Sequence, residues 1–147
     1  MEAIGEHSMS TLSITEHDRL TWARTVWGEA RGESPSGQVA VAYVPWNRAH
    51  ISGQTIGEEC LKPFQFSCWN ANDPNRVKML ALTLDDLPYF IALIGLIMDG
   101  EPDPSHGATF YHVVGLTPPW SHGRTPCASI GHHVFYRDIA PYRGIYG

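Results

Sequence analysis

The sequence predicts a mainly helical α+β domain that ends in a small antiparallel β-hairpin. Two observations point to this class. Several segments begin with a helix-capping residue or a proline, and their apolar residues then recur at helical spacing. After the turn-forming stretch 101–107 the apolar pattern changes to a period of two, which is typical of strands. The composition, 43% hydrophobic and 17% charged over 147 residues, fits one compact globular domain.

Two helices are expected in the first third of the chain. Thr15 and Asp18 form a capping-box pattern that opens the first helix, which should end near Gly32. The expected buried face of this helix consists of Leu20, Ala23, Trp27 and Ala30.

The second helix should start from a Ser34 cap, with Pro35 at its first position, and cover 37–48. Pro45 lies inside it, removes one backbone hydrogen bond and should kink the axis. The alternating valines and alanines of 39–42 also fit a strand, but the cap and the proline favour a helix.

The middle of the chain is expected to begin with a loop-rich segment over 49–71, which ends in the aromatics Phe64, Phe66 and Trp69. Asp73 and Pro74 then open a helix that runs to about Leu84. The apolar run 87–98 forms another helix. It has twelve residues, whereas a bilayer span needs about 20, so stable membrane insertion is not expected.

Two strands are expected in the last third, over 109–114 and 132–138, separated by a loop over 115–131. Phe110 and Tyr111 should point to opposite faces of the first strand, one to the core and the other to a cleft or the surface.

The net charge and the N-terminal sequence limit which partners and which cellular location are expected. Ten Lys and Arg against fifteen Asp and Glu give a net charge of -5, which argues against a nucleic-acid partner. The N-terminus lacks the pattern of a secretory signal peptide. Residues 1–12 are expected to be a mobile tail in front of one domain over 13–147, and the default oligomeric state is a monomer.

The three cysteines form no CxxC pair, which disfavours a zinc ribbon or a thioredoxin-like motif. Cys60 and Cys68 either bridge in an oxidising compartment or remain buried thiols, and the sequence leaves both open. Cys127 lies in a loop and is expected to be free.

Glu29 and Glu33 are four residues apart, so on a continuing helix they share a face with Trp22 and Val26. Partial desolvation beside the apolar side chains of Trp22 and Val26 favours the protonated form of Glu29, and so does the negative end of the helix dipole. That form is what a general acid needs. On spacing alone, two solvated helix-end residues, paired with Arg31, are the simpler interpretation.

Five blocks of sequence change this balance: VWGEARGE (26–33), GQVAVAYVPWNRA (37–49), FQFSCW (64–69), DPSHGATFYH (103–112) and IGHHVFY (130–136). In this order they resemble the cell wall hydrolases of the SleB/CwlJ type, which include spore-cortex-lytic enzymes and phage or bacterial peptidoglycan hydrolases. The resemblance implies a lysozyme-like domain, similar to resuscitation-promoting factors, that cleaves the glycan strand of peptidoglycan without a metal or other cofactor. It implies Glu29 as the catalytic glutamate and a supporting role in the cleft for Glu33.

A glycan cleft needs flat aromatic faces together with amide and hydroxyl partners. The resemblance and this chemistry give the following substrate-binding candidates: Gln65, Phe66, Ser67, Tyr111, His112, Trp120 and His132, besides Glu33. For each aromatic among them a place in the core is the competing interpretation.

One carboxyl acting alone would return as base, take the proton of the sugar's 6-hydroxyl and leave a 1,6-anhydro-muramyl end, as in a lytic transglycosylase. Asp73, Asp99 and Asp103 have sufficient explanations as caps or turn residues. A muramidase that uses water, helped by Glu33 or a cap aspartate, stays open.

Two further alternatives remain. The histidines of the last third, His106, His112, His122, His132 and His133, raise the possibility of a zinc-dependent N-acetylmuramoyl-L-alanine amidase, although no HExxH motif is present. The other alternative is a non-catalytic wall-binding module. The expected setting is a phage endolysin made in the cytoplasm and acting on the cell wall, or a trimmed domain of an exported bacterial protein.

Overall fold

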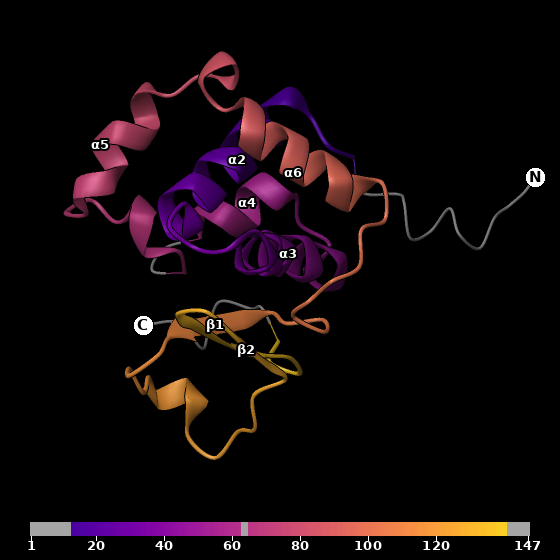
Figure 1. Cartoon of the computed structure of the whole chain (residues 1–147), viewed down its shortest axis with the longest axis vertical. Helices are drawn as coiled ribbons and strands as arrows, with labels where there is room; N and C mark the ends of the chain where they lie inside the picture. The colour runs from indigo at the N-terminus through magenta and orange to yellow at the C-terminus, as the bar shows by residue number, and fades with distance from the viewer. Residues whose placement is uncertain (1–12, 63–64, 141–147) are drawn as a thin grey trace, which may run out of the picture.

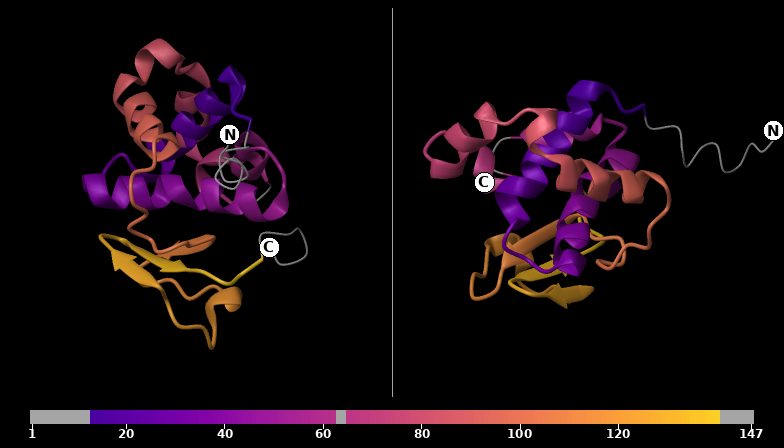
Figure 2. Two further views of the ribbon diagram at one scale, coloured as in Figure 1. Left: turned by 90° about the vertical axis from the view of Figure 1, so that its right-hand side faces the viewer. Right: turned by 45° about the horizontal axis from the view of Figure 1, so that its top comes forward.

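The computed structural model describes residues 13–62 and 65–140, so the expected tail over 1–12 and Phe64 lie outside the described residues. A layer of helices lies over a small sheet, as two views show (Figures 1 and 2). The helices are α2 (Glu16–Ala30), α3 (Pro35–Ser52), α4 (Ile56–Leu61), α5 (Pro74–Ala81) and α6 (Pro88–Met98), with short 3₁₀ turns η1 (Ser67–Trp69), η2 (Leu84–Asp86) and η3 (Pro119–Ser121). The strands are β1 (Phe110–Val113), β2 (Ala128–Ile130) and β3 (His133–Tyr136). The mainly helical α+β class is confirmed.

Helix α2 is the centre of the helical layer and contacts α3, α4, α5 and α6. The predicted capping box is confirmed, because Thr15 Oγ1 accepts from the amide of Asp18 and the Asp18 carboxylate accepts from Thr15. The predicted buried face is partly wrong. Trp22 and Val26 are completely buried, whereas Leu20 and Trp27 are only partly so. Helices on several sides of α2 bury more of its circumference than one stripe.

Helix α3 starts as predicted, with Ser34 Oγ accepting from the amide of Gly37. It is continuous through Pro45 and ends at Ser52, four residues beyond the predicted end. The Trp22 indole donates to the carbonyl of Ala42 at 2.9 Å and thereby fixes α3 against α2.

The expectation of a loop over 49–71 is partly wrong, because α4 and η1 lie within that range. Thr55 caps α4 in a second capping box with Glu58. The amide of Gly57 donates to Asp18 at 3.1 Å, which attaches this short helix to the start of α2.

The helices in the middle follow the predictions, with a shift at one end. Asp73 caps α5, but the helix stops at Ala81 rather than near Leu84, because residues 84–86 form the separate turn η2. Helix α6 covers the predicted apolar run. No helix among the described residues has the length and apolar character needed to cross a membrane.

The predicted hairpin is incomplete. Strands β1 and β3 pair antiparallel, as expected, but β2 adds a third strand on the other side of β3, in the order β1-β3-β2. Strand β2 has three residues and lies inside the expected loop 115–131. It turns into β3 at Gly131, whose φ of +57° favours glycine.

Two clusters of buried apolar side chains stabilise the packing of the helices and the sheet. The larger one joins the helices to Phe135 on the inner side of β3. The smaller one consists of Phe110, Tyr136 and Ile139, with Trp120 and Val134 packed against it. Phe110 therefore enters this smaller cluster, while its neighbour Tyr111 packs against the larger one.

Candidate active site

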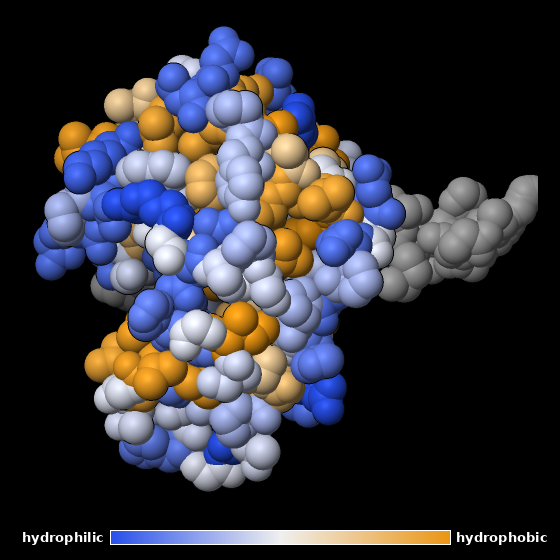
Figure 3. Space-filling view, viewed as in Figure 1, coloured by the Kyte–Doolittle hydropathy of each residue, from blue (hydrophilic) through white to orange (hydrophobic). Residues whose placement is uncertain are grey.

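A cavity of about 780 Å³ lies between the helical layer and the sheet. Its walls come from the end of α2, the middle of α3, residues 65–67, β1 with the segment that follows it, and His133 on β3. Apolar residues gather on the sheet part of the surface (Figure 3). Val113, at the end of β1, and Val114 and Leu116, which follow it, are exposed. Val113 and Leu116 also line the cavity.

Glu29 lies in the last turn of α2, half-buried, and lines the cavity. Its Oε2 accepts from the amide of Cys68 at 2.9 Å and from Ser67 Oγ at 3.3 Å. Its Oε1 accepts from the hydroxyl of Tyr111. Donors from η1 and β1 therefore fix a carboxyl that α2 presents to the cavity.

The backbone of α2 approaches η1 closely at Gly28. A Cβ at this position would lie 2.8 Å from Cys68 Cβ and 2.6 Å from Met79 Sδ. The Trp69 indole donates to Thr25 Oγ1 at 2.8 Å and anchors the same turn. The close approach at Gly28 and the Trp69–Thr25 hydrogen bond together keep the Cys68 amide within hydrogen-bond distance of Glu29.

The cysteine alternatives are resolved in favour of thiols: Cys60, Cys68 and Cys127 are all free, and the first two are buried. Burial raises the pKa of Cys60 to about 12 and raises that of Cys68 further, with the nearby Glu29 carboxylate adding to the rise at Cys68. Thiols in this state are poor nucleophiles. Cys68 serves the site through its backbone amide.

Tyr111 projects from β1 into the wall beside Glu29. Its ring packs on His133, with centroids 4.8 Å apart, and on Phe135 at 5.7 Å. Burial raises the pKa of the Tyr111 phenol well above its ordinary value of 10.0, and the Glu29 carboxylate adds to this rise. The phenol is therefore a neutral donor over the whole physiological range.

An aromatic wall lies on the sheet side of the cavity. Trp120, in η3, contacts Phe110 and Tyr136 edge-on at 5.0 and 5.3 Å. His112 lies beside them, with its Nε2 3.0 Å from the Tyr136 hydroxyl. Trp120 and His112 both line the cavity, together with Phe110.

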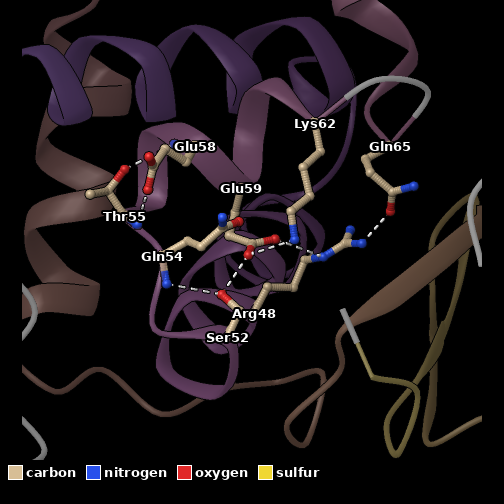
Figure 4. Close-up of polar contacts among 8 residues, drawn as sticks. All are labelled: Arg48, Ser52, Gln54, Thr55, Glu58, Glu59, Lys62 and Gln65. Atoms are coloured by element: carbon tan, nitrogen blue, oxygen red, sulfur yellow. Dashed lines mark hydrogen bonds and ion pairs between the residues drawn. The ribbon is translucent and has the colours of Figure 1, made fainter. Parts of the chain in front are cut away.

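Arg48 is a cavity residue that the sequence analysis missed. Its side chain is 2% exposed and its guanidinium lies 4.5 Å from the Phe110 ring. Arg48 Nη2 donates to Gln65 Oε1, and Nε lies 3.4 Å from Glu59 Oε1 (Figure 4). A signal existed, because Arg48 follows the buried Val44 by one helical turn, so on a helix the two side chains share an apolar face.

Glu59 is completely buried and is the centre of the polar network in Figure 4. Besides its pair with Arg48, its Oε2 accepts from Ser52 Oγ at 2.6 Å and from Lys62 Nζ at 2.9 Å. Arg48 and Lys62 thus share the carboxylate of Glu59.

Most of the predicted site residues meet in the cavity. Its lining includes Glu29, Gln65, Phe66, Ser67, Tyr111, His112 and Trp120. Glu33 and His132 are not among its lining residues.

Glu33 and His132 instead contact each other across the two layers. Glu33 Oε1 accepts from the amide of His132 at 3.1 Å, and Oε2 lies 2.9 Å from His132 Nδ1. His133 Nδ1 is 3.9 Å from Oε1. A Cβ at Gly131 would lie 2.4 Å from this oxygen, so the close approach requires glycine. These contacts, here called the Glu33 latch, join the α2–α3 turn to the β2–β3 turn.

The electrostatics of the latch favour a charged glutamate. Partial burial raises the pKa of Glu33, but the hydrogen bonds from the His132 backbone and ring, with His133 nearby, outweigh it and lower the pKa below 4.5. Burial lowers the pKa of His133, against the opposing effect of Glu33 and Glu29.

The aspartates have the structural roles that the sequence suggested. Asp73 caps α5 and Asp99 ends α6. Asp103 accepts from Ser105, Gly107 and Asn47. Within the described ranges no three His, Cys, Asp or Glu side chains are grouped so as to hold a metal ion.

Comparisons with known proteins agree with this geometry. The sequence model of a family described as Cell Wall Hydrolase matches residues 32–136, starting three residues after Glu29. The fold is similar to the catalytic domain of the Bacillus cereus SleB protein, with a TM-score of 0.69 and 27% identity over 84% of this chain and 91% of that one. It is also similar to the catalytic domain of the germination-specific lytic transglycosylase SleB from Bacillus anthracis, with a TM-score of 0.67 and 27% identity over 84% and 96%. The search of curated proteins gives no match.

Proposed function

Because the chain belongs to the family of cell wall hydrolases, we propose that it cuts the glycan strand of peptidoglycan with Glu29 as its single catalytic carboxyl. One observation carries the single-carboxyl mechanism: Glu29 is the one Asp or Glu among the described residues that line the cavity. The aromatic wall and the polar side chains opposite it suit sugar rings, which present apolar faces edged by hydroxyls. The similarity to a lytic transglycosylase from Bacillus anthracis supports the same reaction type.

The contacts of Glu29 assign its proton. The Cys68 amide can only donate, so Oε2 accepts in both protonation states of the carboxyl. The acid proton therefore belongs on Oε1, beside Tyr111. A phenol both donates and accepts, so Tyr111 can stay in contact with Glu29 whether or not the proton is present.

The reaction then has two proton transfers. Glu29 Oε1 gives its proton to the glycosidic oxygen as the bond to C1 of the muramyl sugar breaks and positive charge builds there. The resulting carboxylate takes the proton of the same sugar's 6-hydroxyl while O6 bonds to C1. The products are a new 4-hydroxyl end and a 1,6-anhydro-muramyl end, and Glu29 is protonated again.

Neither Glu33 nor a cap aspartate is available as a second carboxyl in this scheme. Glu33 is engaged in the latch and Asp103 accepts from three partners. A retaining or inverting glycosidase would need a second carboxyl across the scissile bond. The cavity therefore favours the transglycosylase over the muramidase.

The test is the substitution Glu29→Gln, which keeps the shape and most of the hydrogen bonds but removes the transferable proton. We expect the release of soluble muropeptides from purified peptidoglycan to fall by at least about 10²-fold. Mass spectrometry of the wild-type products should show 1,6-anhydro-muramyl ends. New reducing ends would assign a muramidase instead, freed stem peptides an amidase, and an unchanged rate in the variant would remove Glu29 from the mechanism.

As a matched control, Glu16→Gln makes the same chemical change at the exposed start of α2, outside the cavity. Its rate should equal that of the wild type. The proposed biological setting is that of an endolysin acting on the wall.

A further inference from the structure

His133 lies between the Glu33 latch and Tyr111, and the proposed reaction assigns no step to its imidazole. It is the first residue of β3, and its side chain is 6% exposed. Its Nδ1 is 3.9 Å from Glu33 Oε1, and its ring centroid is 4.8 Å from that of Tyr111. A continuous line of contacts therefore leads from Glu33, through this ring and Tyr111, to Glu29.

The register of the sheet brings His133 to Tyr111. Tyr111 pairs with Phe135, so His133, two residues earlier on β3, lies diagonal to Tyr111 on the same face of the sheet. Residues at the end of an element fray unless the adjoining segment is fixed. Here the adjoining segment is fixed, because the amide of His132 donates to Glu33. The latch therefore determines where the His133 ring lies.

Glu33 also selects one orientation of the His133 ring. A lowered pKa keeps the Glu33 carboxylate charged at neutral pH, and a carboxylate can only accept. Nδ1 of His133 is buried and has no hydrogen-bond partner among the described residues, so the nearby carboxylate favours a proton on this nitrogen. A ring turned over by 180° would place a carbon, Cδ2, towards Glu33 and lose this attraction. The ring that packs on Tyr111 is thus oriented by Glu33.

The His133 ring is neutral at pH 7, because burial lowers its pKa below 6.5. The carboxylates of Glu33 and Glu29 oppose this effect. The imidazoles of His132 and His112 act in the same direction as burial. A neutral ring adds no positive charge beside Glu29, which has to keep its proton as an acid. The line of contacts therefore acts through position.

We propose that Glu33 and His133 are positioning residues: the Glu33 carboxylate fixes the His133 ring, and this ring holds Tyr111 where its hydroxyl meets Glu29. This inference rests on the proposed cleavage with Glu29 as the acid. A change at Glu33 should lower the rate of the chemical step although Glu33 is not a lining residue of the cavity. For the same reason, substrate binding should be unaffected.

The kinetic test is a double-mutant cycle of Glu33→Gln and Tyr111→Phe, with the release of soluble muropeptides measured over a range of peptidoglycan concentrations. Glu33→Gln alone should lower kcat about three- to tenfold and leave the apparent KM unchanged. In the Tyr111→Phe background the same change should cost no further activity, because the hydroxyl through which Glu33 acts is missing. Equal fold losses in both backgrounds would overturn the proposal, and so would an unchanged kcat in Glu33→Gln.

A matched control separates positioning from a general loss of stability. Thr55→Ala removes the cap of α4, outside the cavity, and so costs stability without touching the line of contacts. Its kcat should equal that of the wild type at a temperature where both proteins are folded. A loss like that of Glu33→Gln would mean that stability alone sets the rate, which would overturn the proposal.

His133→Phe tests the middle of the line. It keeps an aromatic ring against Tyr111 but offers no N–H to Glu33. Adding Glu33→Gln to this variant should leave kcat unchanged. A further loss would show that Glu33 acts on the rate by another route and would remove His133 from the proposal.

An NMR titration separates this inference from the proposed function, because it needs no cleavage. In Glu33→Gln the imidazole of His133 should titrate at lower pH, since the carboxylate that raises its pKa is gone, and the ring signals of Tyr111 should shift. Glu16→Gln should change neither. Unchanged Tyr111 signals in Glu33→Gln would overturn the positioning role, whatever the protein cuts. Shifted signals in a protein that cuts no wall would overturn only the proposed reaction.

Discussion

At the scale of single residues, Tyr111 joins the sheet to the proposed acid. The substitution Tyr111→Phe removes one hydroxyl and leaves the ring contacts with His133 and Phe135 in place. We expect kcat for muropeptide release to fall about 10- to 100-fold, with KM little changed, because the hydroxyl contacts Glu29 rather than completing the fold. Tyr89→Phe is the matched control: its hydroxyl also donates a hydrogen bond, to Gln38 outside the cavity. If both variants lose the same activity, Tyr111 has no special role.

The raised pKa of Tyr111 gives a second, independent prediction. Its folded value lies above its unfolded value, so the neutral phenol contributes stability that is complete below pH 10 and is lost as pH rises through the folded value. In a spectrophotometric titration of the folded protein, the Tyr111→Phe difference should show a tyrosine that ionises later than an ordinary one. A difference curve centred near pH 10 would contradict this environment.

How far the residues could be predicted depends on what each one needs. Glu29 could be predicted from the sequence, because the block around it resembles a known family and because helical spacing places it on one face with Trp22 and Val26. Arg48 was missed because its partners, Glu59 and Gln65, come from segments that only folding brings to it. Helical spacing places Arg48 on the same face as Val44, but it does not indicate which distant residues pair with the guanidinium.

At the scale of elements, the Glu33 latch joins the turn that follows α2 to the turn that precedes β3 through hydrogen bonds. Glu33→Gln should lower the free energy of unfolding near pH 7 by about 0.5–1 kcal/mol, since it removes charge-assisted hydrogen bonds to His132, whose side chain is exposed to solvent. The folded pKa of Glu33 is lowered, so its contribution is present above pH 4.5 and disappears as pH falls through the folded value. Urea unfolding at pH 7 and at pH 3 should therefore show the variant and the wild type converging in acid.

Gly131→Ala tests the same latch without changing a polar group. The new Cβ would lie 2.4 Å from Glu33 Oε1, so the carboxylate must shift and its contacts with His132 must lengthen. Gly123→Ala is its control, because Gly123 also has a positive φ, +76°, but nothing within 4 Å of the added carbon. We expect Gly131→Ala to lose clearly more stability and activity than Gly123→Ala. Equal losses would mean that backbone strain alone is responsible.

The elements that prediction missed are the short ones. Helix α4 has six residues and β2 has three, so neither shows enough periods to be recognised. The capping-box pair Thr55 and Glu58 was nevertheless visible and could have marked the start of α4. Strand β2 forms because β3 offers an edge with which it pairs, which is information held by the partner strand.

At the scale of the whole molecule, the site exists only while the two layers are in contact. The helical layer brings Glu29 and Arg48, and the sheet brings Tyr111 and the aromatic wall. The sheet side has a small apolar cluster of its own, much smaller than the core under the helices. It should therefore open at lower free energy than the helical layer.

This difference predicts that activity is lost before helicity. In a urea titration, the rate of muropeptide release should fall at a lower denaturant concentration than the far-UV circular dichroism of the helices. Hydrogen exchange should likewise be faster in β1 and β3 than in α2 and α3. Coincident curves for rate and helicity would show a single cooperative unit instead.

Because the backbone of α2 approaches η1 closely at Gly28, this position should tolerate few substitutions, whether they arise in evolution or by design. A single added carbon there would displace the turn that carries the Cys68 amide, although position 28 itself presents nothing to a substrate. In a saturation library, this codon should be as intolerant as that of the neighbouring acid. A designer who grafts the acid onto another scaffold must copy that empty volume along with it.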